Sequence, residues 1–257
     1  ARDIPESSEH DDSILTWSSV ARANVAGLTD DPGASIKFDL QAHHAGLASG
    51  QTRVALVSAV NAAESFATLG ELDAALEWSE RALSMARAAK WPASIGVCLM
   101  QIGDVLRLLS RHAEARTFLQ EGLQVMGPVA GSRNYEQLIG NLGQLALDVG
   151  KFDEALDWFT KFDSSLDSRI GSDLVMKARR GQATALSRLG RPDEARVKVA
   201  EVLALAREKG NADEQIRALR VFAELQREHA MPPPPDMTAP SAELHYLLEA
   251  LRITASI

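Results

Sequence analysis

The sequence predicts an all-α solenoid of about six helical hairpins. The phrase LGELDAALEWSERAL, residues 69–83, recurs in similar form as VGKFDEALDWFTKF and LGRPDEARVKVAEVL, and the turn positions lie 40 residues apart at Gly70, Ser110, Gly150 and Gly190. A fixed period of this length indicates stacked copies of one supersecondary unit. Alanine and leucine are abundant and β-branched runs are few, which is typical of packed helices.

Each repeat is predicted to form a helical hairpin. A turn of the type Gly-x-x-Asp/Glu stands between two stretches whose apolar residues recur at helical spacing. The expected helix pairs are 54–69 with 73–90, 94–109 with 112–126, 133–149 with 153–167, 173–189 with 192–209, and 212–229 with 240–255. A less regular first pair is expected within 12–48. A single solenoid would then span residues 1–257, with regular repeats over 54–209.

The predicted helix ends support these bounds. Gly210 suits the positive φ of a helix end, and Asn211 with Glu214 has the spacing of a capping box that starts the next helix. The proline-rich segment MPPPPDM, residues 231–237, interrupts the period, so that the last hairpin resumes late. A rigid spacer explains this segment better than a proline-rich ligand motif does.

Composition argues against several classes of function. The net charge of -8 and the pI near 5.3 oppose general nucleic-acid binding, which needs Lys and Arg to displace counterions from phosphates. Cys98 is the only cysteine, so neither an intrachain disulfide nor a C-x-x-C site can form. No apolar run approaches the roughly 20 residues that cross a bilayer, and the N-terminus is too polar for a signal peptide. We therefore expect a cytoplasmic location.

These residues resemble the tetratricopeptide repeat family. That family has small residues at the eighth, twentieth and twenty-seventh positions of its hairpin, so that neighbouring helices approach closely. The eighth and twentieth positions here are Ala63, Gly103, Gly143 and Ala183, and Ala75, Ala115, Ala155 and Ala195. The twenty-seventh position holds Ala82 and Gly122 but then Phe162 and Val202, which suggests a locally wider helix spacing. The resemblance implies a right-handed α-α superhelix, and the 40-residue period resembles the longer arrays of bacterial signalling proteins.

The resemblance also implies a binding surface on the inner face of the superhelix, which the first helix of each hairpin lines. The sixth position gives Asn61, Gln101 and Asn141, and in the family an asparagine there often holds the main chain of a peptide ligand. A carboxamide offers both a donor and an acceptor, as an extended peptide backbone requires. Gln144 belongs to the same inner face. The alternative is that three exposed amides align by chance.

The character of this face changes along the chain. The second and fifth positions hold Val57, Val60, Val97 and Met100 in the early repeats, but Lys177, Arg180, Arg217 and Arg220 in the late ones. Guanidinium groups bind carboxylates or phosphates through paired hydrogen bonds. The predicted groove therefore runs from apolar to basic and suits an acidic ligand. The alternative is an ordinary solvated face in which internal ion pairs neutralise the charges.

Other residues give weaker signals. His43 and His44 are adjacent and would point roughly 100° apart on a helix, so they cannot chelate one ion, and a partly exposed helix end is their expected setting. Cys98 is expected to be an inert core thiol, and Trp78 and Trp158, at equivalent positions, indicate repeated packing. The sequence contains no glycine-rich phosphate loop, metal-ligand spacing or activated nucleophile. We expect no catalysis by this chain, no cofactor and no metal.

The sequence leaves two classes of function. The first is a non-catalytic interaction or sensory module that binds a peptide or a segment of a partner protein in its concave groove. The second is a structural or dimerising scaffold that positions a fused output domain such as a diguanylate cyclase. The last expected helix is amphipathic to its end and residue 1 is not methionine, so we expect a fragment of a longer bacterial signalling protein. No general nucleic-acid partner and no membrane partner is expected, and a homodimer is compatible with both classes.

Overall fold

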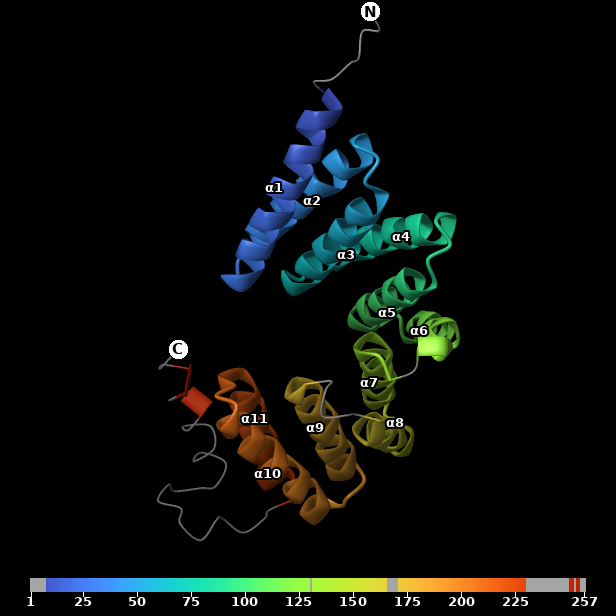
Figure 1. Ribbon diagram of the computed structural model, residues 1–257. Coiled ribbons are helices and arrows are strands. Elements are labelled where there is room, and N and C mark those ends of the chain that lie inside the picture. The colour runs from blue at the N-terminus through green and yellow to red at the C-terminus, as the bar shows by residue number, and fades with distance from the viewer. Residues whose placement is uncertain (1–7, 130, 166–170, 230–249, 252, 255–257) are drawn as a thin grey trace, which may run out of the picture. The chain divides into compact units, whose positions relative to one another are not determined.

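The computed structural model describes residues 8–129, 131–165, 171–229, 250, 251, 253 and 254. Over these ranges the chain forms α-helices, one short 3-10 helix and no strand (Figure 1), which confirms the all-α prediction. The helices are α1 (Ser8–Leu28), α2 (Pro32–Ala48), α3 (Thr52–Thr68), α4 (Leu72–Ala88), α5 (Pro92–Leu108), α6 (His112–Met126), α7 (Arg133–Asp148), α8 (Phe152–Ser165), α9 (Ser172–Arg188), α10 (Pro192–Glu208) and α11 (Ala212–His229).

Most of these bounds lie within two residues of those expected from the sequence. The largest difference among the described helices is the start of α1, which begins at Ser8 instead of residue 12. The proline-rich segment 231–237 and most of the expected helix 240–255 lie outside the described residues. None of the described helices combines the length and the apolar character that crossing a membrane requires.

One kind of turn connects most of the helices. The predicted turn residues Gly70, Ser110, Gly150 and Gly190 have φ between 59° and 79°. In the first of these turns the Glu71 N–H donates to the Phe66 carbonyl five residues earlier, at 2.9 Å, which closes the helix end. The same positive φ occurs at Asp30, Gly50, Lys90 and Gly210. The turn therefore recurs every 20 residues over much of the chain, which is half the period read from the sequence.

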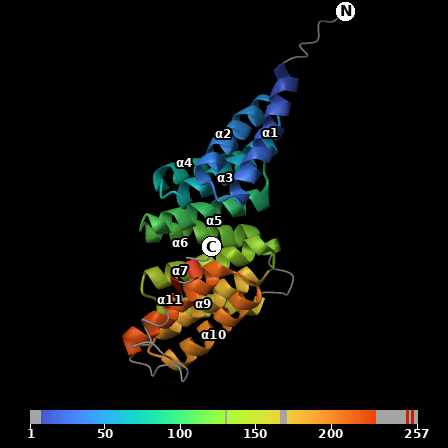
Figure 2. The same ribbon diagram turned by 90° about the vertical axis from the view of Figure 1, so that its left-hand side faces the viewer.

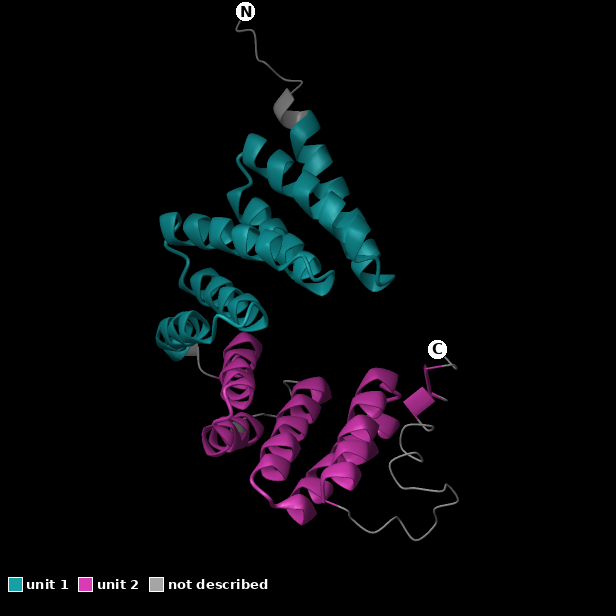
Figure 3. Ribbon diagram, turned by 180° about the vertical axis from the view of Figure 1, so that it is seen from behind, with its two compact units in different colours: residues 1–128 teal, residues 129–257 magenta. Residues whose placement is uncertain are grey.

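The chain divides into two compact units, Ala1–Pro128 and Val129–Ile257 (Figure 3). In unit 1 each helix from α1 to α6 packs on the next, and α3 also contacts α5. In unit 2 each helix from α7 to α11 packs on the next, α7 also contacts α9, and α9 contacts α11. Within each unit successive helices lie side by side (Figure 2). The first helices of the unit 2 hairpins are therefore neighbours.

Glycines make room for large side chains between the helices of a hairpin. A Cβ atom on Gly103 would lie 2.5 Å from Cγ of Leu119, and one on Gly140 would lie 2.8 Å from Cε1 of Phe162. Leu119 and Phe162 are both fully buried. The sequence predicted that Phe162 widens the helix spacing, whereas the structure shows a facing glycine on α7 that accommodates the ring.

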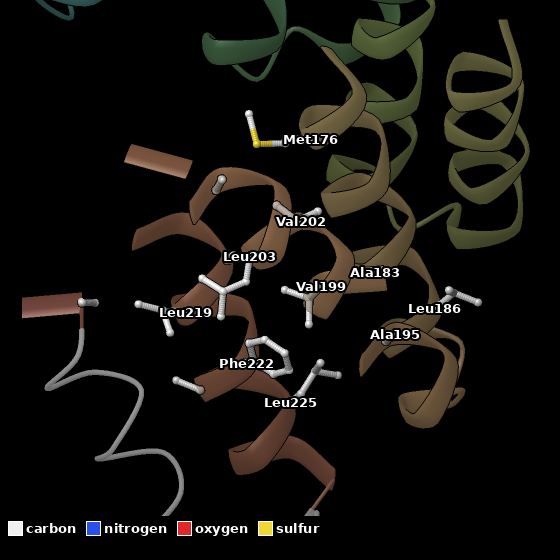
Figure 4. Close-up of a cluster of buried hydrophobic side chains, with 14 residues drawn as sticks. Met176, Ala183, Leu186, Ala195, Val199, Val202, Leu203, Leu219, Phe222 and Leu225 are labelled. Carbon is white, nitrogen blue, oxygen red and sulfur yellow. The ribbon is translucent and has the colours of Figure 1, made fainter. Parts of the chain in front are cut away.

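One part of the core of unit 2 lies among α9, α10 and α11. Val199 and Leu203 of α10 gather with Leu219 and Phe222 of α11 in one buried cluster (Figure 4). Ala250, one of the few described residues near the C-terminus, belongs to the same cluster. This core fixes the positions of α9 and α11, the two helices that carry the basic residues singled out from the sequence.

Candidate functional site

Five of the predicted ligand-binding residues line one hollow of about 290 Å³ in unit 2. Its lining comes mainly from α7, α9 and α11, the first helices of three hairpins, with Phe159 added by α8. The five residues are Gln144, Lys177, Arg180, Arg217 and Arg220. Glu224 is the one acidic side chain among the described residues of the lining. We call this hollow the basic pocket.

The spacing of the basic residues along their helices explains why they meet. Lys177 and Arg180 are three residues apart on α9, and Arg217 and Arg220 are three residues apart on α11. Residues at this spacing lie on the same side of a helix, one turn apart. Because α9 and α11 contact each other, the two pairs come together at the pocket.

A buried glutamate holds the two central arginines. Glu214 is 7% exposed and accepts hydrogen bonds from Arg180 Nε at 3.3 Å and from Arg217 Nη1 at 3.2 Å. The Glu214 N–H donates to Oδ1 of Asn211 at 3.0 Å, so the predicted cap of α11 forms while the glutamate side chain turns to the arginines. One carboxylate shared by two guanidinium groups leaves a net positive charge at this point.

The other predicted binding residues of the pocket, Lys177, Gln144 and Arg220, differ in their internal contacts. Lys177 Nζ donates to Oδ1 of Asn141 on α7 at 3.2 Å, and Asn141 is itself buried. Gln144 Nε2 donates to Asp148 Oδ1 at 3.0 Å along the same helix. Arg220 is exposed and forms no ion pair with another described residue. Arg220 is therefore the cation of the pocket with the least internal competition for a ligand.

An aromatic ring fixed between two glycines lies against the basic pocket. A Cβ atom on Gly181 would lie 2.5 Å from Cδ1 of Phe159, and one on Gly143 would lie 3.0 Å from Cε1 of the same ring. Phe159 is fully buried, and its ring occupies the space beside both glycines. The pocket therefore combines a rigid apolar base with basic side chains.

Asn61 lies in a different hollow, in unit 1. This hollow of about 570 Å³ is formed by α1, α2, α3 and the α1–α2 turn, and its acidic lining residues are Asp30, Asp31, Asp39 and Glu64. We call it the acidic pocket. Asp39 is 3% exposed, and although its side chain is hydrogen-bonded to Asn61, burial raises the pKa of Asp39 to about 6, because desolvation disfavours the charged carboxylate.

Gln101 lies in neither pocket. Its Nε2 donates to the carbonyl of Val60 on α3 at 2.9 Å, and its Oε1 is buried without a hydrogen-bond partner. The side chain therefore links α5 to α3. Asn61 and Gln101 belong to unit 1 and Asn141 to unit 2, and the amide ladder as a ligand site stays a prediction.

His43 and the cysteine are packing residues, whereas His44 is exposed. His43 was expected at a partly exposed helix end, but it is buried, with Nδ1 2.8 Å from the Ala55 carbonyl oxygen and its ring edge-on to Trp78. Burial lowers the pKa of His43 and raises the pKa of the Cys98 thiol to about 12, as expected of a core thiol. No group of three or more His, Cys, Asp and Glu side chains among the described residues could hold a metal ion.

Sequence reasoning missed three features of these pockets. The pairing of Glu214 with Arg217 could have been predicted, because Glu214 stands one turn before Arg217 on the same helix, where opposite charges pair. Asp39 had none, because its burial depends on the packing of α1 and α3 around it. Gly181 could also have been noticed, since it replaces the carboxamide at the sixth position of the repeat and so leaves space beside Phe159.

The repeats match a known family by sequence. One model described as tetratricopeptide repeat matches residues 95–161, and a second with the same description matches 56–81 and 176–197. The chain carries tetratricopeptide repeats. These matched segments lie in both units. A comparison with curated protein sequences finds no match.

Solved structures with low sequence identity resemble this tetratricopeptide-repeat chain in fold. The apo form of RapI has a TM-score of 0.74 at 14% identity, and the match covers 95% of this chain and 85% of RapI. A Rap protein complexed with competence and sporulation factor has a TM-score of 0.75 at 13% identity, over 94% of this chain and 64% of that one. The Rap conjugation gene regulator of plasmid pLS20, in complex with the Phr* peptide, has a TM-score of 0.72 at 12% identity, over 99% and 77%. At these identities the similarity shows the fold alone, an α-α solenoid.

Proposed function

We propose that this chain is a non-catalytic interaction module that binds an acidic peptide, or an acidic segment of a partner protein, in the basic pocket. The observation that carries the proposal is the convergence of four basic side chains on one hollow of unit 2, namely Lys177, Arg180, Arg217 and Arg220. Guanidinium groups bind carboxylates with two parallel hydrogen bonds. A hollow of about 290 Å³ is at the small end of ligand pockets, which suits one or two side chains of a longer ligand.

The fold comparison supports a peptide as the class of ligand. Two of the similar structures are complexes, one with competence and sporulation factor and one with the Phr* peptide. At 13% and 12% identity neither ligand can be assigned to this chain. The acidic character of the proposed ligand rests on the residues of the basic pocket.

Glu214 leaves room for a ligand at the arginines it holds. It engages one nitrogen of Arg180 and one of Arg217, whereas a guanidinium group has five N–H donors. An incoming carboxylate can therefore bind the two arginines without displacing Glu214, and exposed Arg220 adds a third cation. We assign the carboxamide of Gln144, at the same pocket, to the main chain of the ligand.

The test is a binding titration with a labelled hexaglutamate peptide and a labelled hexalysine peptide as probes. We expect the protein to bind the acidic probe and not the basic one, and binding to weaken with added salt because the attraction is screened. Arg217→Glu and Arg180→Glu should each weaken binding at least about tenfold, because a hydrogen bond to a charged group contributes about 1.5–3 kcal/mol.

The matched control is Arg188→Glu. Arg188 also lies on α9 but forms an ion pair with Glu228 and does not line the pocket. This variant should bind the acidic probe nearly as well as the parent protein does. An equal loss in the Arg188 and Arg217 variants would mean that net charge, and not the basic pocket, determines binding.

The alternative function, a dimerising scaffold that positions a fused output domain, is favoured by a different observation. Large apolar side chains are exposed along α1, far along the sequence from the basic pocket. Only the dimerising part of this alternative has support among the described residues. The fused domain stays a prediction from the sequence.

A further inference from the structure

Helix α1 carries its large apolar side chains on the outside. The side chains that it buries are small or polar, namely Thr16, Ser19, Ala23 and Ala26. Val20 is half-buried, but the other large apolar side chains are exposed, among them Ile14 at 59%, Trp17 at 57%, Val25 at 60% and Leu28 at 87%. An amphipathic helix at the surface of a protein normally has the reverse arrangement.

This exposure is concentrated on α1. Five of the twelve exposed large apolar residues in the described part of the chain lie on this one helix, and the other seven are spread over the remaining structure. Single exposed apolar residues are ordinary, whereas a contiguous patch marks an interaction site. The apolar side of α1 therefore needs a partner surface.

The exposed residues form a stripe whose spacing is the same in both directions. Four of these residues and exposed Ala21 follow one another at separations of 3, 4, 4 and 3 residues, as Ile14, Trp17, Ala21, Val25 and Leu28, and Leu15 lies outside the series. At 3.6 residues per turn these five positions fall within a sector about 80° wide. We call them the α1 stripe. It is symmetric about Ala21 and contains no charged residue.

We propose that the α1 stripe is the contact surface of a homodimer, in which two copies of α1 cross in antiparallel orientation about a two-fold axis at Ala21. In a two-fold interface, if one residue contacts a second, the second must contact the first on the partner. Around Ala21 this condition pairs Ile14 with Leu28 and Trp17 with Val25 of the second copy. The small side chain of Ala21 lies at the crossing point, where the two helices are closest.

The geometry of the stripe allows the paired side chains to interdigitate. Trp17 and Val25 lie on opposite edges of the sector, as do Ile14 and Leu28 to a smaller degree. In an antiparallel two-fold pair, the two side chains that meet at the same height along the helices come from opposite edges of the stripe. The bulky residues therefore lie beside each other and do not collide. The two-fold symmetry of the stripe gives a second copy this complementary pairing automatically, whereas a partner of unrelated sequence would not have it. We therefore infer that a second copy covers the stripe.

The area of the stripe sets the expected strength. The exposed portions of its four large side chains amount to roughly 500 Å² on each copy, or about 1,000 Å² for the pair, which is the lower limit for a specific interface. We therefore expect a reversible dimer that dissociates on dilution into the micromolar range. This inference goes beyond the proposed peptide binding, because α1 contributes no residue to the basic pocket.

The first test measures molar mass by sedimentation equilibrium from low micromolar to near-millimolar protein. We expect a monomer–dimer equilibrium for the parent chain and a monomer at all concentrations for Trp17→Glu. Val197→Glu is the matched control, because Val197 on α10 is equally exposed, at 58%, and should leave the dimer intact. A parent chain that stays monomeric throughout, or a dimer that Trp17→Glu does not weaken, overturns the proposal.

The second test checks the register with a short bis-maleimide cross-linker. Cys98, the native cysteine, is buried, so introduced cysteines provide the reactive sites. Ala21→Cys should cross-link to itself across the two-fold axis, whereas Ile14→Cys and Leu28→Cys should cross-link only when the two variants are mixed. Equal cross-linking of Leu28→Cys on its own would contradict the antiparallel register.

Discussion

Unit 1 and unit 2 each bury a carboxylate beside a pocket, but the two carboxylates have opposite surroundings. In unit 2, Glu214 is 7% exposed and accepts hydrogen bonds from Arg180 and Arg217. In unit 1, Asp39 is 3% exposed, and the neutral amide of Asn61 is its side-chain partner. A buried charge is costly unless an opposite charge compensates for it. The same helical repeat therefore carries a compensated carboxylate in one unit and an uncompensated one in the other.

The comparison shows that the repeat fixes the backbone and leaves the charge of each pocket free to vary. The turns and the buried small residues recur in both units. The basic pocket depends instead on four side chains at the second and fifth positions of two late repeats, where the early repeats have apolar residues. A ligand-binding property can therefore be confined to one unit without a change of fold.

The largest expected effect concerns the uncompensated carboxylate. The pKa of Asp39, about 6 in the folded protein, lies above its ordinary value of 3.8, so the folded state binds the proton more tightly than the unfolded state does. Proton binding by Asp39 therefore stabilises the folded state fully below about pH 4, and this contribution is lost as the pH rises through about 6. Asp39→Asn should therefore raise the free energy of unfolding at neutral pH by about 3 kcal/mol and have no effect below about pH 4, as measured by urea denaturation.

Glu64→Gln is the control for this prediction. Glu64 lines the same acidic pocket but is exposed, so removing its charge should change the stability by less than about 0.5 kcal/mol. If Asp39→Asn lowered the stability at neutral pH, a group other than Asn61 would have to compensate the carboxylate of Asp39.

The next effect compares glycines in the two units. Gly181→Ala should lower the free energy of unfolding by about 1–3 kcal/mol, because the new methyl group would overlap the confined Phe159 ring. Gly27→Ala, the same change on α1, meets no atom within 4 Å and should stabilise the protein by about 0.5–1 kcal/mol through helix propensity. Thermal unfolding of the two variants should shift in opposite directions, and equal shifts would show that Phe159 is free to move.

The compensated carboxylate should behave in the opposite way to Asp39. Glu214→Gln removes the shared partner of Arg180 and Arg217, so it should lower the free energy of unfolding by about 1–2 kcal/mol. It should also strengthen binding of the hexaglutamate probe severalfold, because a negative charge that repels the probe disappears from beside the basic pocket.

Glu228→Gln is the matched control, since it removes the partner of Arg188 outside the basic pocket. This variant should leave the affinity for the hexaglutamate probe unchanged. Weaker binding by Glu214→Gln would indicate that Glu214 orients the arginines for the ligand and does not compete with it.

The sequence predicted the hairpins because the turn that separates their helices is local. Gly70, Ser110, Gly150 and Gly190 recur at a fixed distance and each adopts positive φ. Lys90 makes the same turn and was not recognised, because a lysine gives no conformational signal for positive φ. The sequence thus predicted the turns that the 40-residue period marks, Ser110 included, and missed others, such as Gly50 and Lys90.

The pocket contacts were less predictable because they join residues far apart in the chain. Repeat positions indicated which basic side chains share a face, but Glu214 was assigned only to a helix cap, and its side chain reaches Arg180, 34 residues earlier. Likewise Phe162 suggested a wider helix spacing, whereas Gly140 on the facing helix makes room for its ring. These pairings depend on which side chains face each other across packed helices, and the repeat period does not encode that.

The most direct test of ligand binding at the basic pocket is to follow backbone amide chemical shifts while the hexaglutamate probe is titrated into the labelled protein. We expect saturable shifts for residues of α9 and α11 around Lys177, Arg180, Arg217 and Arg220. We expect no shifts around Asp39 in the acidic pocket of unit 1, where an acidic ligand would be repelled. Shifts that gather in unit 1, or that spread over both units without saturating, would contradict the assignment of ligand binding to the basic pocket.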